Sequence, residues 1–327
     1  MKLNRLFFII IVLQSLLFSG CWSSHEVNTL GITVCIGIDK TENGYLVTKQ
    51  ILNPSTIASD REMTESPIVV YSVEVSSMAE VNGRLMMKLS RKINNTHLRL
   101  VVFGEDVAKE GIENILDYFA RNHEFRTDYY FAVARNATAK EILGILTPIE
   151  MVPGVDMYNS LKMSEDEWAS IKSIRVIELV NSIMAEGKNP VLTGIKIDRK
   201  NKINANSTEI LKLTDEYNLL ELSNMCAFNK DKLVGWLDED ESKGYNYITG
   251  NVKRTAENAY NDQVKISSMI MHVKSNTRVN LSENEPFIEV KIKIEQNIRS
   301  IEGNFDISSK ENKQVLNEMF ESKVKSL

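Results

Sequence analysis

One cysteine near the N-terminus stands where its thiol could carry a lipid. Cys21 follows Gly20 and closes an apolar run, residues 6–18, that comes after Lys2 and Arg5. A basic start, an apolar stretch and a small-residue exit form the pattern of an export signal. The apolar stretch is shorter than the roughly 20 residues that a membrane-spanning helix needs. The chain is therefore predicted to be exported.

The position of Cys21 resembles the end of a bacterial lipobox, in which the thiol receives a diacylglyceryl group and the cysteine becomes the first mature residue. We therefore predict a signal peptide over residues 1–20 and lipidation of Cys21. Phe18 departs from the pattern, since lipoboxes usually carry Leu at that position. Two acyl chains give a stable anchor at roughly 0.8 kcal/mol per buried CH₂. The alternative is a secreted protein or a signal anchor with an incidental cysteine.

The remaining residues offer no catalytic pattern. The sequence contains no Gly-x-Ser-x-Gly elbow, no His-Glu-x-x-His pair and no glycine-rich phosphate loop. The acidic run 238–241 lacks the alternating spacing of a calcium loop and is typical of a solvated helix start. The histidines have no mutual metal-ligand spacing; they are His25, His97, His123 and His272. We expect no enzyme activity, no catalytic residue, no metal site and no cofactor.

Two further cysteines and a group of aromatic residues leave alternatives. Cys35 and Cys226 could form a disulfide in an exported protein. Because they lie in different predicted domains, we predict that they are two buried thiols. Trp236, Tyr245 and Tyr247 are interpreted as a core cluster of the C-terminal domain. The functional alternative is a partner-binding surface, because Trp and Tyr dominate binding hot spots.

Composition restricts the classes of partner. The chain has 39 Lys and Arg residues and 44 Asp and Glu residues, so its net charge is −5. Removal of the signal peptide takes away Lys2 and Arg5, so the net charge of the mature chain is −7. Nucleic-acid binding needs a basic surface, so this balance argues against it. It also argues against adhesion to anionic lipid by charge alone. The 43% hydrophobic content is that of an ordinary globular protein.

Local patterns predict the elements that hold these residues. Strands are expected where apolar residues alternate or cluster, with a hairpin turn at Asn43-Gly44. Helices are expected after capping patterns that begin at Ser77, Thr138, Ser164 and Ser308. The expected strands are 31–40, 45–52, 68–75, 98–103, 129–134, 191–197, 264–273 and 287–294, with a hairpin over 225–237. The expected helices are 77–91, 111–122, 164–185, 238–250 and 308–327, with a further one after Thr138.

This order of elements predicts an α+β fold, with mixed α/β layers and antiparallel sheets, in more than one domain. The strict alternation after Phe287 indicates a strand with one buried face and one solvated face. The predicted divisions are a signal peptide 1–20, an N-terminal α/β domain 21–195 of one or two subdomains, a linker region 196–216 and a C-terminal α+β domain 217–327.

Three groups of strings, in this order, resemble the Ger(x)C family of spore germination lipoproteins, the C subunits of nutrient germinant receptors. The first runs from Gly20-Cys21-Trp22 through Gly37-Ile38-Asp39-Lys40 to Asn53-Pro54-Ser55. The second is residues 97–108, His-Leu-Arg-Leu-Val-Val-Phe-Gly-Glu-Asp-Val-Ala. The third is residues 228–238, followed by Gly244-Tyr245 and Thr249-Gly250. Together the three groups cover nearly the whole mature chain.

The resemblance implies mixed α/β domains and assembly with an A subunit and a permease-like B subunit. It places the protein on the outer surface of the spore inner membrane, held by the lipid on Cys21. Family members continue past the last predicted helix into at least one further strand, so the resemblance implies a C-terminal domain cut short at Leu327.

The resulting functional prediction is a non-enzymatic lipoprotein subunit of a germinant receptor. The alternative is a solute-binding lipoprotein of a transporter. That class usually has two lobes with repeated parallel βαβ units, and the antiparallel alternation after Phe287 argues against it.

Overall fold

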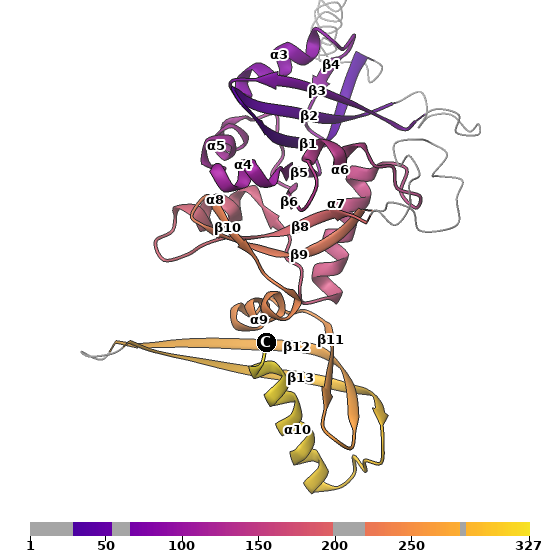
Figure 1. The fold of residues 1–327 in the computed structure, drawn as a ribbon, viewed down its shortest axis with the longest axis vertical. Helices are drawn as coiled ribbons and strands as arrows, with labels where there is room; N and C mark the ends of the chain where they lie inside the picture. Colours follow the sequence, from indigo (N-terminus) through magenta and orange to yellow (C-terminus); the bar gives the residue numbers. More distant parts are fainter. Residues whose placement is uncertain (1–28, 54–65, 199–219, 282–285) are drawn as a thin grey trace, which may run out of the picture.

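A computed structural model describes residues 29–53, 66–198, 220–281 and 286–327. The molecule is elongated, with a large sheet near one end and a small antiparallel sheet at the other (Figure 1). We call residues 29–237 the N-terminal unit and residues 238–327 the C-terminal unit. The chain ends beside α9, where the two units meet (Figure 1). The predicted lipidation site, Cys21, and the signal peptide lie outside the described residues.

The large sheet mixes parallel and antiparallel pairs, in the order β10-β9-β8-β6-β5-β1-β2-β3. The four central strands are parallel: β1 pairs with β5, β5 with β6, and β6 with β8. The strands towards both edges of the sheet pair in antiparallel fashion. Two short strands pair beside this path, β4 with β1 and β7 with β6. The strands are β1 Leu30–Thr41, β2 Gly44–Leu52, β3 Ile68–Val75, β4 Lys92–Asn94, β5 Leu100–Phe103, β6 Tyr130–Ala134, β7 Ile174–Arg175, β8 Val191–Ile197, β9 Leu220–Asn229 and β10 Lys232–Trp236.

Helices cover both faces of the large sheet. One core cluster joins α3, α4, α5 and α8 to one face, and another joins α6 and α7 to the opposite face. Every residue of β5 and β6 is buried, as expected for parallel strands between two helical layers. The helices are α3 Val81–Met86, α4 Glu105–Glu110, α5 Glu113–Arg121, α6 Ala139–Gly144, α7 Pro153–Glu167 and α8 Val176–Met184, with a 3-10 turn Met78–Glu80 before α3.

The C-terminal unit contains a three-stranded antiparallel sheet in the order β11-β12-β13. Its strands are β11 Thr255–Tyr260, β12 Lys265–Leu281 and β13 Pro286–Glu302. Two helices pack against this sheet, α9 Glu239–Thr249 and α10 Lys310–Lys325. The outer part of the β12–β13 hairpin projects beyond the body of the molecule (Figure 1). The mixed α/β, multi-domain fold class is therefore confirmed.

Local signals located several elements correctly. Thr138 and Glu141 form the reciprocal capping box of α6, and Asp238 and Glu241 form the same arrangement on α9. The first hairpin turns at Glu42-Asn43, with Gly44 at φ +148° as the first residue of β2. A Cβ on Gly44 would lie 2.2 Å from the carbonyl oxygen of Val75, so β3 also requires glycine there.

Other predictions about elements were wrong. The helix expected over 164–185 is two helices, because α7 begins at Pro153 and the chain leaves the helix at Trp168 to contact the C-terminal unit. Proline suits the first helical turn, which is consistent with α7 beginning at Pro153. The helix after Ser77 ends at Met86 instead of near residue 91, and α10 is capped by Ser309, one residue later than expected.

The hairpin β9–β10 also differs from the expected organisation. Sequence reasoning assigns residues 225–237 to the C-terminal domain, but β9 pairs with β8 and extends the large sheet. The hairpin pattern defines the two strands and their turn, and it contains no information on which third strand they join. The described part of the expected linker, residues 196–198, belongs largely to β8.

Candidate interaction surface

The described cysteines and acidic residues form no reactive site. Cys35 and Cys226 are buried and unpaired, which confirms the prediction of two buried thiols. Burial raises the pKa of Cys35, and it raises the pKa of Cys226 to about 12, so neither thiol is a ready nucleophile. The acidic run at Asp238 is the solvated start of α9, as predicted. Across the described ranges, no three His, Cys, Asp or Glu side chains converge to hold a metal ion.

The aromatic residues belong to packed layers. Tyr247 is 1% exposed and lies in the core between α9 and the small sheet. Trp236 packs on the core of the large sheet, and the guanidinium of Arg135 lies 4.7 Å from the centre of its ring. The core interpretation is confirmed for Tyr247. It was wrong in placing Trp236 in the same cluster, because Trp236 ends β10 and packs on the large sheet.

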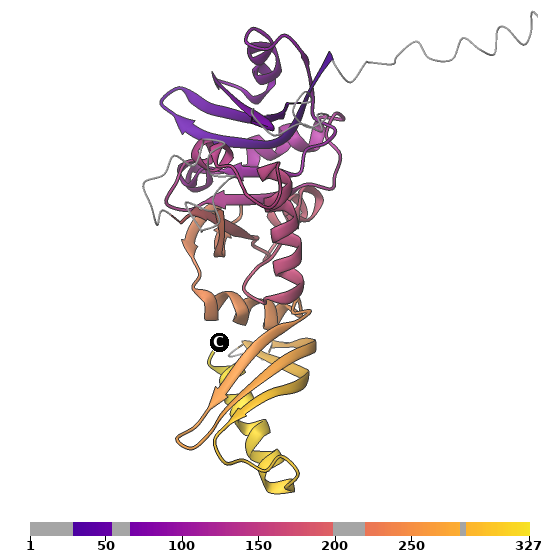
Figure 2. The ribbon, with the colours of Figure 1, turned by 90° about the vertical axis from the view of Figure 1, so that its right-hand side faces the viewer.

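A buried asparagine connects the two units. The side-chain amide of Asn246, on α9, donates hydrogen bonds to the backbone oxygens of Ala169 (2.6 Å) and Ile171 (3.1 Å), which follow α7. Asn246, Ala169 and Ile171 are all buried. Removal of the amide would therefore leave two carbonyl oxygens in a buried place without this donor. α7 itself runs from the large sheet to this junction (Figure 2). Sequence reasoning did not identify Asn246. Its position on a predicted helix, between Tyr245 and Tyr247, could have indicated a buried polar residue.

Charged residues reinforce this junction. The ammonium of Lys243 lies 4.2 Å from the centre of the Trp168 ring and 3.6 Å from the carboxylate of Glu257. Burial raises the pKa of Glu257, although the charge of Lys243 opposes the shift. Nearer to solvent, Lys253 pairs with Asp166 at 2.6 Å. The junction therefore combines buried polar contacts with exposed ion pairs.

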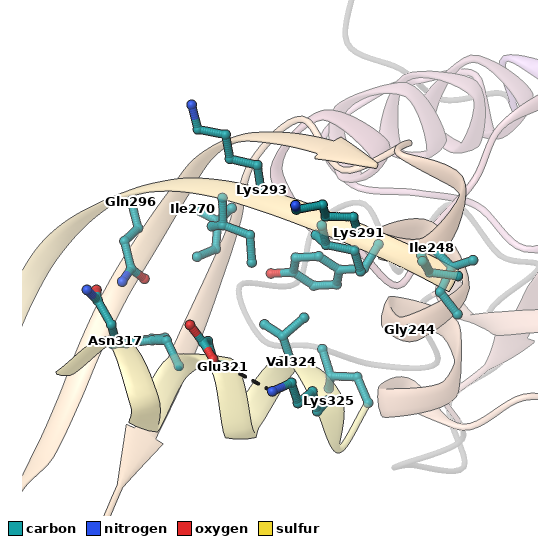
Figure 3. A pocket seen from close by; sticks show the side chains of 16 residues that line it. Gly244, Ile248, Ile270, Lys291, Lys293, Gln296, Asn317, Glu321, Val324 and Lys325 are labelled. Carbon is teal, nitrogen blue, oxygen red and sulfur yellow. Dashed lines mark ion pairs between the residues drawn. The ribbon is translucent and has the colours of Figure 1, made fainter. Parts of the chain in front are cut away.

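An apolar groove of about 610 Å³ lies between β13, α9 and α10. Ile270 and Val324 point into it from β12 and α10 (Figure 3). Lys293 points away from α10, and Glu321 pairs with Lys325 at 3.6 Å (Figure 3). This volume is within the range of binding sites in proteins, and the lining is predominantly apolar.

The groove continues into an uncovered strand face. Along the apolar face of β13, the exposed fraction increases from the half-buried Ile292 and Ile294 to 37% at Val290 and 61% at Ile288. The alternation predicted for this strand is present, but the outer part of its apolar face is not buried by any described element. Contiguous exposed apolar surface of this kind is typical of an interaction site.

No helix within the described ranges has both the length and the apolar character needed to cross a bilayer.

Comparison with known proteins gives concordant matches along the chain. Residues 23–197 match the family described as "Spore germination protein N-terminal domain", and residues 223–327 match "Spore germination B3/ GerAC like, C-terminal". Spore germination protein KC of Bacillus subtilis (strain 168) is 29% identical over 311 residues, covering 92% of this chain and 76% of the relative. Spore germination protein B3 of the same organism is 20% identical over 301 residues, covering 89% and 72%.

One solved structure has a similar fold. The crystal structure of the GerBC protein matches with a TM-score of 0.51 at 17% identity, covering 89% of this chain and 78% of that one. At this identity the likeness concerns the fold alone.

Proposed function

The chain belongs to the GerAC-like, or Ger(x)C, family of spore germination proteins, and from this premise we propose that it is a lipid-anchored subunit of a nutrient germinant receptor. The observation that carries the proposal is the pair of family matches, which together cover residues 23–197 and 223–327 in order. In this role the protein is an interaction subunit without enzyme activity. It assembles with an A subunit and a permease-like B subunit.

The anchor in this proposal is a diacylglyceryl group on Cys21. Support comes from the lipobox-like sequence, in which an apolar run and Gly20 precede the cysteine. Two acyl chains hold a protein stably at a membrane, whereas one chain gives only marginal binding. The proposed location is the outer surface of the spore inner membrane.

Deletion of the gene tests the receptor role. The deletion strain is expected to lose its response to at least one germinant while growth and sporulation stay normal, and a wild-type copy should restore the response. Normal germination on every nutrient tested, in a strain without a redundant paralogue, would contradict the proposal.

The anchor needs a separate experiment. In the complemented strain, Cys21→Ser is expected to shift the protein from the membrane fraction to the soluble or unprocessed fraction and to lower germination. Cys226→Ser is the matched control, because Cys226 is buried in the large sheet. Normal membrane recovery of the Cys21→Ser protein would show that another feature anchors it.

The transporter alternative gains no support from the fold. A solute-binding protein of that class has two doubly wound lobes, whereas the described strands form one mixed sheet and one antiparallel sheet. A strong thermal stabilisation of the isolated protein by amino acids or sugars would favour the alternative.

A further inference from the structure

We propose that residues 84–92, from the end of α3 to the start of β4, rest on the anionic lipid surface of the membrane that holds the protein. We call these residues the basic segment. Their contact with the lipid headgroups sets the orientation of the molecule on the bilayer. This orientation rests on the proposed lipid anchor at Cys21, and it adds a second contact that the anchor itself does not provide.

The first support is the charge of the basic segment. Residues 81–104 contain no Asp or Glu, although the whole chain has a net charge of −5. Arg84 forms an ion pair with Glu80 at 2.9 Å, whereas no described carboxylate forms an ion pair with Lys88 or Arg91. Each Lys or Arg close to an anionic membrane strengthens binding by about fivefold. The basic residues of the segment are Arg84, Lys88, Arg91 and Lys92.

The second support is the exposure of two methionines in the same segment. Met86 is 45% exposed and Met87 is 86% exposed. Leu85 beside them is fully buried in the core of the large sheet, so the end of α3 is held with both methionines outside. Lys88 is also exposed, and its ammonium donates a hydrogen bond to the backbone oxygen of Ser72 at 2.8 Å. Exposed apolar side chains beside basic ones suit the boundary between lipid headgroups and acyl chains.

The third support is the position of the segment beside the start of the described chain. β4 pairs in parallel with the first residues of β1, and Lys92 lies opposite Leu30. Only residues 22–28 separate Cys21 from Thr29. Eight residue steps in full extension span at most roughly 28 Å. A lipid on Cys21 therefore keeps this end of the molecule close to the bilayer.

Other exposed methionines lie next to acidic residues. Met163, on α7, is 67% exposed and precedes the acidic run 165–167. Met184, on α8, is 73% exposed and stands two residues before Glu186. Anionic headgroups repel such sites. Exposed methionines with basic neighbours, beside the tether, occur in the basic segment.

The contact determines which end of the molecule faces the membrane. α3 and β4 lie at the end of the elongated molecule opposite the C-terminal unit (Figure 1). With the basic segment on the lipid surface, the molecule stands on this end. The C-terminal unit is then the part farthest from the bilayer.

The test uses the lipidated protein in vesicles of phosphatidylglycerol and phosphatidylcholine. Met87→Cys introduces a thiol for a fluorescent label. Cys35 and Cys226 are buried and the thiol of Cys21 carries the lipid, so the label goes to the new position. Lipids with a nitroxide on the headgroup are expected to quench it. Met163→Cys is the matched control, because Met163 is an exposed methionine near the end of α7 at the junction, and its label should stay unquenched.

Charge is tested by lipid composition, salt and substitution. Quenching at Met87→Cys is expected to weaken in phosphatidylcholine alone and as salt is added. Adding Lys88→Glu/Lys92→Glu should remove most of the quenching, and Lys88→Gln/Lys92→Gln should remove part of it. Lys310→Glu/Lys313→Glu makes the same change in net charge on α10 and should keep the quenching. Melting temperatures equal to that of the wild type show that each variant is folded.

The outcomes separate this contact from the anchor. An unquenched label at Met87→Cys on a protein that stays bound to the vesicles would overturn the contact and leave the anchor standing. Equal quenching of the Met87→Cys and Met163→Cys labels, or equal quenching in the two charge-reversed variants, would also overturn it. Shielding of the Met87→Cys label from iodide only after other receptor subunits are added would assign the segment to a protein interface. Failure of the protein to bind vesicles would overturn the anchor and this contact together.

Discussion

β6 in the large sheet and β13 in the small sheet are covered in opposite ways. β6 has neighbours on both edges and helical layers on both faces, and each of its residues is buried. β13 has a neighbour on one edge and helices on part of one face, and its outer apolar residues are exposed. The first arrangement leaves no surface for a partner. Among the described residues, the second has one strand neighbour and an apolar face that is only partly covered.

This contrast separates stability from recognition within one chain. Fully buried strands contribute to stability through packing, so substitutions there should affect folding. Half-covered strands contribute less to stability, and their substitutions should affect binding. The junction at Asn246 is the point where the two regions depend on each other, because its amide belongs to one unit and the carbonyls that it binds belong to the other.

The largest effect is expected in the core of the large sheet. Phe131→Ala should lower the free energy of unfolding by about 3–5 kcal/mol, because the ring is fully buried and stacks on Phe103 at 5.4 Å. Ile288→Ala on β13 is the matched substitution at an exposed site and should stay within about 0.5 kcal/mol. Urea unfolding measures both. A similar loss for the two variants would remove the contrast between the sheets.

The junction should give the next effect. Asn246→Ala leaves the oxygens of Ala169 and Ile171 without their donor in a buried place and should cost about 1–3 kcal/mol. Hydrogen exchange should show the C-terminal unit opening more readily than the large sheet. Asn251→Ala is the control, since its side chain donates a hydrogen bond to the hydroxyl of the exposed Thr249. Unchanged exchange in Asn246→Ala would mean that other contacts hold the units together.

One buried lysine should make the stability of the protein depend on pH. Lys49, on β2, is 1% exposed and bonds to Asn82 and Asn95, and burial lowers its pKa to about 7. Between that value and the unfolded value of about 10.5, the unfolded chain binds more protons, so stability should rise with pH by up to about 1.4 kcal/mol per unit. Below pH 7 this contribution to stability is absent.

Urea unfolding at pH 7.5 and pH 9 measures this slope. Lys49→Met should remove the contribution of Lys49, because no group is left to titrate there. If Lys49→Met and the wild type have the same slope, the ammonium of Lys49 is not desolvated in the folded protein.

The smallest effect is expected at the start of α9. Asp238→Ala removes the side chain that accepts a hydrogen bond from the backbone N–H of Glu241 and should cost about 1 kcal/mol. Glu241→Gln keeps an acceptor for the N–H of Asp238 and should change stability less. A thermal melt of each variant is sufficient, and equal losses would indicate that charge near the helix start matters more than the cap.

Signals within a few residues of each other were predicted well. The hairpin turn beside Gly44 and the capping box at Thr138 lie where the sequence indicated them. Contacts between distant residues were not predicted. The carboxylate of Asp39 accepts hydrogen bonds from the N–H groups of Ala139 and Lys140 and thus caps α6 from β1, a contact across 100 residues. Nothing in the local pattern of either segment encodes it.

The sequence by itself determined most of the strands, several helix starts, the buried thiols and the family, because alternation, capping and motif strings act over short distances along the chain. Only the tertiary structure decided that β9 and β10 complete the large sheet, that Asn246 joins the two units and that the described helices cover only part of the apolar face of β13. Those outcomes depend on which surfaces meet when the sheets pack. An alternating strand has the same pattern whether its apolar face is covered or free.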